Sequence, residues 1–205
     1  MTGKLFISIF DSIPLWVMIT PIFICSIIGL AVFIERMIFY KNLKINYRPI
    51  MDGITEALRS GNSKGARALC ASYSGPLIEM INSALDRWSD VNDKELFIKD
   101  LSEEAVRSIE RFAGIISTIS TISPMLGLLG TVTGMMKSFS GLSSYGPAAQ
   151  DLLAQGITEA LITTALGLMV AIPAVTFYNF MVSKVDFFMR EVEYIANSLI
   201  AAGDE

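Results

Sequence analysis

The sequence predicts an all-α integral membrane protein with three transmembrane helices. Of its 205 residues, 52% are hydrophobic and only 18% are charged, which is too apolar for an ordinary soluble domain. The apolar residues gather in three windows that contain no charged residue, 12–34, 112–136 and 160–183. Each window is longer than the roughly 20 residues that a helix needs to cross a bilayer. We therefore expect each window to span the membrane once.

The first window has an alternative interpretation as a cleaved signal peptide. Such a peptide has a basic start, an apolar core of about 7–15 residues and small residues at the cleavage site. Here Lys4 is offset by Asp11, the apolar run is longer, and no Ala-x-Ala site follows. We expect this window to be a retained span.

Lysine and arginine residues indicate the side of the membrane on which each loop lies. Twelve of the sixteen lie between Glu35 and Arg111, whereas the opposite side carries only Lys4 and Lys137. Because basic residues near span ends favour the cytoplasm, we expect this region and the tail to be cytoplasmic and the N-terminus to lie outside. The predicted regions are an outer segment 1–11, a first span 12–34, a cytoplasmic helical region 35–111, a second span 112–137, an outer loop with the start of the third helix 138–158, a third span 159–183 and a cytoplasmic tail helix 184–205.

Charge balance and residue types exclude several functions. Region 35–111 carries twelve acidic and twelve basic residues, so it is not a basic nucleic-acid-binding arm. The chain has no histidine, which removes His-based catalysis, His metal ligands and His proton relays. No nucleophile motif or phosphate-binding loop is present, so we expect no enzyme, no metal site and no cofactor.

The second and third spans are predicted to extend into a cytoplasmic helical bundle. Before the second window, apolar residues recur at intervals of three or four: Phe97, Leu101, Ala105, Ile109 and Phe112. No helix breaker separates this pattern from the window, so we expect one long helix that runs from a cap at Asp93 through the second span. The tail extends the third span in the same way.

Small and hydroxyl-bearing residues line one face of the second span. At about 100° per residue, this face contains Ser120, Pro124, Gly127, Thr131, Gly134 and Ser138. Such a face suits a helix that lines a narrow pore, or one that packs closely on another helix as Gly130-x-x-x-Gly134 would. The stripe alone favours packing. On the third span, Thr164, Gly167 and Ala171 form a second small face.

Glu159 is the only acidic residue close to the hydrocarbon. An acidic residue at membrane depth usually faces a cavity or a partner, but a position about 37 Å along the helix from Lys184 also allows a solvated site at the outer interface. About 140° around the helix separates Glu159 from Thr164. We therefore place Thr164 toward a pore with Thr131, and Thr163 beside the glutamate.

Two segments on successive spans resemble the proton-channel family of ExbB, TolQ and MotA. They are PMLGLLGTVTGM at 124–135 and GITEALITTALGLMVAIPA at 156–174, and their order, spacing and topology agree with the family. Three spans rather than four favour the ExbB/TolQ branch. By motif position, Thr131 and Thr164 match the family's pore threonines and Glu159 its span-three glutamate. The helix-packing or pore stripe comprises Pro124, Gly127, Gly130, Gly134, Ser138, Gly167, Ala171 and Pro173.

The resemblance implies a homopentamer in the bacterial inner membrane whose second and third spans surround a pore. Inside that pore would lie an ExbD- or TolR-like single-span protein with a membrane Asp, which the spans of this chain lack. The implied function is the proton-channel housing of an ExbB–ExbD type motor that uses the proton motive force to energise a TonB-like protein for outer-membrane transport. A TolQ-like subunit that acts with a TolA-like protein in envelope integrity and division, a gliding-type motor and a non-conducting membrane scaffold remain alternatives.

Overall fold

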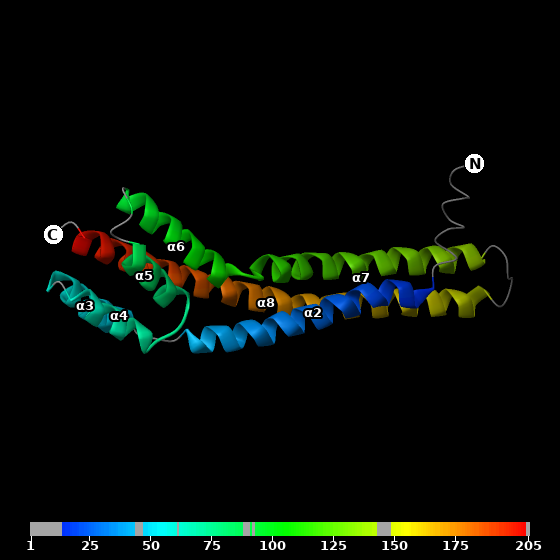
Figure 1. Ribbon diagram of the computed structural model, residues 1–205. Helices are drawn as coiled ribbons and strands as arrows, with labels where there is room; N and C mark the ends of the chain where they lie inside the picture. Colours follow the sequence, from blue (N-terminus) through cyan, green and yellow to red (C-terminus); the bar gives the residue numbers. More distant parts are fainter. Residues whose placement is uncertain are drawn as a thin grey trace. The chain divides into compact units, whose positions relative to one another are not determined.

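The computed structural model describes residues 14–43, 47–60, 62–87, 91, 93–142 and 149–203, and this part of the chain is mainly helical, with no strand. The helices, coloured along the chain in Figure 1, are α2 Leu15–Asn42, α3 Tyr47–Arg59, α4 Ser63–Ala71, α5 Pro76–Arg87, α6 Lys94–Glu110, α7 Ala113–Leu142 and α8 Ala149–Gly203. The all-α prediction is confirmed. The predicted outer segment 1–11 and positions 143–148 of the predicted outer loop lie outside the described residues.

Three of these helices are long and apolar enough to cross a membrane, as the sequence predicted. Their candidate spans are Trp16–Asn42, Ala113–Phe139 and Leu153–Ala201. Most large apolar side chains on them point outward, including Trp16, Leu128 and Met169. Outward-facing apolar side chains are expected for helices whose solvent is lipid. The sidedness of the loops stays a prediction.

The chain divides into two compact units, each described separately. The first unit contains the start of α2, all of α7 and the first half of α8, within residues 1–34 and 112–179. Its core holds Ile22 of α2, Ile116 and Ile119 of α7, and Ala160 and Ala171 of α8. The second unit contains the end of α2, helices α3 to α6 and the second half of α8, within residues 35–111 and 180–205.

Helix α8 forms part of the core of the second unit. Its buried residues follow a spacing of three and four: Met181, Val185, Phe188, Val192, Ile195 and Leu199. This spacing places them on one face of the helix. Helix α8 runs without interruption from Ala149 to Gly203, so the prediction that the helix of the third span continues into the tail is confirmed as far as Gly203.

Side-chain caps begin two helices of the second unit. Asn62 Oδ1 accepts a hydrogen bond from the backbone N–H of Gly65 at 2.9 Å at the start of α4. Asp93 Oδ1 accepts one from Leu96 at 3.0 Å at the start of α6, as the sequence predicted. Each cap satisfies a backbone donor that the first turn of a helix leaves unpaired.

The prediction of one unbroken helix from Asp93 through the second span is wrong. Helix α6 ends at Glu110, and α7 begins at Ala113. Arg111 between them has an extended ψ of 134°, and Phe112 has a φ of +70°. Few bulky residues adopt that left-handed conformation. The last carbonyls of α6 accept hydrogen bonds from side chains of α2, as described below, and this interaction has no local signature in the sequence.

Candidate functional site

The glycines of α7 and α8 form a close contact between these two helices. A Cβ atom added at Gly127 would lie 3.0 Å from the carbonyl oxygen of Thr163, and one added at Gly167 would lie 2.6 Å from that of Ser123. The contacts at Gly130, Gly134 and Gly156 are similarly tight. At Gly127, Gly134 and Gly167 the nearest atom belongs to the backbone of the facing helix, whereas at Gly130 and Gly156 it is the side-chain oxygen of Thr163 or Ser138. Glycine at these positions lets the two helices approach closely. The glycines of the predicted stripe thus pack within the chain.

The other members of the stripe occupy different places. Ser138 is buried, and its hydroxyl donates to the carbonyl of Gly134 in its own helix at 3.0 Å and lies 3.4 Å from that of Leu153 on α8. Ala171 is buried in the core of the first unit. Pro124 is partly buried inside α7, and Pro173 is exposed inside α8. The stripe therefore contains residues of the helix contact together with residues at its margins.

Thr131 and Thr164 lie on the same edge of the α7–α8 pair. The hydroxyl of Thr164 donates to the carbonyl of Gly127 on α7 at 3.1 Å. Thr131 follows Gly127 by one helical turn and sits at the margin of the buried face of α7. Its hydroxyl donates to the carbonyl of Leu128 in its own helix at 2.7 Å. Both threonines are partly exposed, so their hydroxyl oxygens remain within reach of a molecule that approaches this edge.

Thr163 belongs to the helix contact. It is completely buried, and its hydroxyl donates to Ala160 at 2.8 Å and to Gly127 at 3.5 Å. The expectation that Thr163 accompanies Glu159 is therefore not reflected in its hydrogen bonds. Thr164 is the next residue along α8 and differs by about 100° around the helix. That rotation separates a threonine of the helix contact from one at its edge.

Glu159 lies on the opposite edge of the pair from Thr164. Its side chain is partly exposed, and its Oε1 accepts a hydrogen bond from Gln155 Nε2 at 3.4 Å. The buried positions Ala160 and Thr163 lie between the angular positions of Glu159 and Thr164 on the helix surface. Glu159 shares its side of α8 with Phe177, whose ring packs edge-on against Phe33 of α2 at a centroid distance of 4.6 Å.

Sequence reasoning missed two buried polar residues in this helix pair. The Oγ atom of Ser123 is buried without a hydrogen-bond partner among the described residues. Thr133 is buried, and its hydroxyl donates to the carbonyl of Gly130 at 3.0 Å. Both lie at three- or four-residue spacings from the glycines of α7, and that spacing was the signal for their burial.

Comparisons with known proteins match a part of the chain that includes α7 and most of α8. Residues 73–194 match the sequence model of the MotA/TolQ/ExbB proton channel family. A putative biopolymer transport protein ExbB-like 3 of Synechocystis is 29% identical over 162 residues, which cover 78% of this chain and 77% of that protein. The biopolymer transport protein ExbB of Salmonella typhimurium is 28% identical over 187 residues, or 86% and 76% of the two chains. The Tol-Pal system protein TolQ of Haemophilus influenzae is 46% identical over 74 residues, or 36% and 32%.

Proposed function

Because this chain belongs to the MotA/TolQ/ExbB proton channel family, we propose that it is the channel-housing subunit of an inner-membrane motor driven by the proton motive force. In this proposal, α7 and α8 of five copies surround a pore. A single-span ExbD- or TolR-like protein inside the pore supplies the membrane Asp that titrates. The motor energises a TonB-like protein that spans the periplasm. Region 35–111 and the chain's tail lie in the cytoplasm, and the N-terminus lies in the periplasm.

The shared edge of Thr131 and Thr164 carries this proposal. A threonine hydroxyl has one donor and two acceptor lone pairs. In each of these residues the donor already points at a backbone carbonyl, at 2.7 Å for Thr131 and 3.1 Å for Thr164. What each residue offers to a visiting molecule is therefore an acceptor. An acceptor binds a water molecule or the O–H of a protonated carboxylic acid, but not an ionised carboxylate.

These hydroxyls therefore suit a partner Asp that crosses the membrane in its protonated form. Ionised carboxylates are costly inside a bilayer, so a protonated and hydrogen-bonded Asp is the form that the hydrocarbon tolerates. For Thr131 or Thr164 to donate to an ionised Asp, the hydroxyl would have to rotate away from its carbonyl. The threonine edge thereby distinguishes the two protonation states without titrating itself.

Glu159 has a different role in this proposal. It lies on the opposite edge from Thr164, about 140° around α8, so it does not share that edge. We assign it to the contact with a neighbouring copy or to the outer mouth of the pore. Its bond to Gln155 supplies one donor, which leaves acceptor sites for a group of the neighbouring copy.

The pathway that the motor serves has two candidates. Relatives that align over most of the chain are ExbB proteins, and this favours the transport role. TolQ proteins align over a shorter segment at higher identity, which supports the envelope role as the alternative. The helix packing described above is equally compatible with a non-conducting scaffold, so the threonines provide the decisive test.

The test replaces Thr131 and Thr164 separately with Val, which preserves volume and removes the hydroxyl. Full-length variants are reconstituted in liposomes with an ExbD-like or TolR-like partner, and proton uptake is followed with a pH-sensitive dye. We expect each variant to assemble normally and to lose at least tenfold in proton flux. The lost bond from Thr164 to Gly127 should affect folding little, because hydrogen bonds between membrane helices average about 0.6 kcal/mol.

Thr118→Val is the matched control. Thr118 is an exposed threonine of α7 whose hydroxyl also donates within its own helix, to Gly114 at 2.8 Å. It lies on the apolar side of α7, so its loss should leave the flux unchanged. Full flux in both Thr131→Val and Thr164→Val would refute the role of these hydroxyls in the proton path. A wild-type complex with no flux above that of empty liposomes would leave the non-conducting scaffold as the better description. Higher proton flux with the ExbD-like partner would favour the ExbB-like role, and higher flux with the TolR-like partner would favour the TolQ-like role.

A further inference from the structure

The break between α6 and α7 occurs where the local sequence favours a continuous helix. Residues 107–113 read RSIERFA and contain neither Gly nor Pro. Phe112 nevertheless has a φ of +70° at the second residue after α6 ends. At such a position helices that end in the left-handed conformation usually carry Gly. An unusual backbone conformation at a bulky residue persists only where the surrounding structure holds it.

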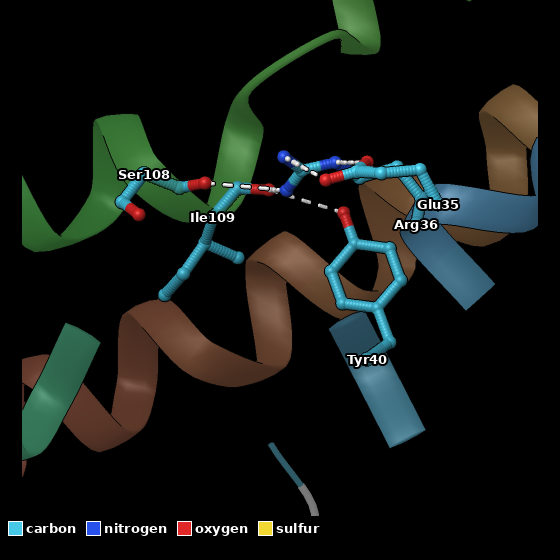
Figure 2. Close-up of polar contacts among 5 residues, drawn as sticks. All are labelled: Glu35, Arg36, Tyr40, Ser108 and Ile109. Atoms are coloured by element: carbon cyan, nitrogen blue, oxygen red, sulfur yellow. Dashed lines mark hydrogen bonds and ion pairs between the residues drawn. The ribbon is translucent and has the colours of Figure 1, made fainter. Parts of the chain in front are cut away.

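Two side chains of α2 hold the end of α6 (Figure 2). The guanidinium of Arg36 donates through Nη1 to the carbonyls of Ser108 at 3.3 Å and Ile109 at 3.5 Å. The hydroxyl of Tyr40, one turn along α2, donates to the same Ile109 carbonyl at 3.1 Å. The last carbonyls of a helix lack intrahelical donors and carry partial negative charge, so a cation with several N–H groups is well suited to cap them.

Arg36 is fixed in this position. Its side chain is 2% exposed, and its Nε lies 2.8 Å from Oε2 of Glu35. Its Nη2 donates to the other carboxylate oxygen at 3.3 Å, and the guanidinium carbon lies 4.5 Å from the centre of the Phe39 ring. A buried charge needs such compensation. Glu35 therefore holds the guanidinium of Arg36 in place, and Arg36 and Tyr40 donate to the end of α6.

The carbonyls that Arg36 and Tyr40 bind are those that a continuous helix would need. In an uninterrupted helix the Ser108 carbonyl accepts from the N–H of Phe112, and the Ile109 carbonyl accepts from that of Ala113. The same two acceptors can thus be satisfied by α2 side chains with the helix broken, or by backbone donors with the helix continuous. In the continuous form Phe112 would return to the right-handed helical conformation.

We propose that residues 94–142 have two states, one in which the helix is broken at residues 111–112, as in this structure, and one in which it is continuous. In this proposal the side chain of Arg36 stabilises the broken state. In the broken state α6 and α7 can move independently about residues 111–112. In the continuous state they move as one rod. The proposal goes beyond the channel function and does not depend on it, since it rests only on the ends of α2, α6 and α7.

The test measures whether α6 and α7 are collinear. Nitroxide labels are placed at Asp100→Cys on α6 and Thr121→Cys on α7, both exposed, in the full-length chain with Cys25→Ser and Cys70→Ala. Labelled chains are diluted tenfold with unlabelled ones in lipid nanodiscs, and pulsed electron resonance gives the distance. A continuous helix places these 21-residue-separated positions about 32 Å apart. We expect Arg36→Met to raise the population near 32 Å at least tenfold, and Tyr40→Phe to raise it less.

Two further variants distinguish the loss of the Arg36 contacts from general damage to the fold. Lys41→Met removes a neighbouring exposed charge of α2 and should leave the distances unchanged. In Arg36→Met, the additional change Phe112→Gly should restore the broken-state distances, because Gly adopts a positive φ freely and disfavours the continuous helix. A change that only damaged the fold would not be repaired by a second destabilising residue.

Several results would overturn the proposal. A dominant peak near 32 Å in the wild-type chain would mean that the helix is already continuous. An unchanged Arg36→Met distribution, or one that only broadens, would mean that Arg36 does not select between two states. Failure of Phe112→Gly to restore the wild-type distances would show that Arg36→Met acts through misfolding.

Discussion

Replacing Gly167 with Ala should weaken the α7–α8 pair by an amount that the geometry allows us to estimate. The added Cβ would lie 2.6 Å from the carbonyl oxygen of Ser123, and 3.1 Å from the Cα of Gly127. Both are backbone atoms of α7, so no side chain can rotate away. Ordinary contact begins near 3.4 Å, so the helices must separate locally by about 0.8 Å.

That separation also affects the hydrogen bond between Thr164 and Gly127. Its length of 3.1 Å would increase to as much as about 3.9 Å, which is beyond hydrogen-bonding distance. Overpacking costs about 1–3 kcal/mol, and loss of an interhelical bond in a membrane about 0.6 kcal/mol. Alanine's higher helix propensity offsets up to about 1 kcal/mol of this cost, so we expect Gly167→Ala to lower the free energy of unfolding by about 1–3 kcal/mol.

The assay is reversible unfolding in mixed micelles with increasing SDS, followed by energy transfer between dyes on α7 and α8. Gly114→Ala is the control on α7, because a Cβ at Gly114 would meet nothing within 4 Å. Alanine has a higher helix propensity than glycine, so this control should be neutral or stabilising by up to about 1 kcal/mol. If Gly167→Ala were as stable as Gly114→Ala, the helices would separate without cost, and the close-contact reasoning would be refuted.

Two more predictions concern other parts of the chain. A Cβ at Gly130 would overlap the side chain of Thr163, so Gly130→Ala should destabilise the pair, and adding Thr163→Ala should recover at least half of the loss; strictly additive effects in a double-mutant cycle would contradict this contact. Burial raises the pKa of Tyr47 from its usual 10 to about 12. The folded state then holds this proton more tightly than the unfolded state, so the contribution of Tyr47 to the stability of the second unit is constant below about pH 10. It should fall between about pH 10 and 12 by up to about 2.7 kcal/mol. Tyr47→Phe should remove this part of the alkaline loss in denaturant titrations at several pH values, and an unchanged slope would exclude Tyr47 as its source.

The features that the sequence predicted well are those with local or periodic causes. Three uncharged windows predict three spans because hydrocarbon thickness sets their length. The cap at Asp93 depends on one side chain and the N–H of Leu96, three residues away. The extension of α8 follows from a spacing of apolar residues that continues past Lys184. In each case the chain within a few turns contains all the necessary information.

The end of α6 could not be predicted because its causes are distant in sequence. The residues around Phe112 favour a helix, and the donors that end it come from Arg36 and Tyr40, about 70 positions earlier. The position of Arg36 after the first window indicated only the side of the membrane on which we expect it. That this arginine is buried and caps another helix follows from tertiary packing, which overrides local propensity.

For the threonines, helical angles predicted the positions of the side chains but not the directions of their hydroxyl protons. Angles alone placed Thr131 and Thr164 on faces that could meet, and Glu159 away from Thr164, but they gave no direction for the hydroxyl protons. The structure directs both protons to backbone carbonyls, at 2.7 Å and 3.1 Å. The glycine contact then holds the two helices at a fixed separation, so these oxygens are preplaced and lose little entropy when they bind. In the proposed channel the chain would therefore supply fixed acceptors, while the titrating proton carrier must belong to a partner.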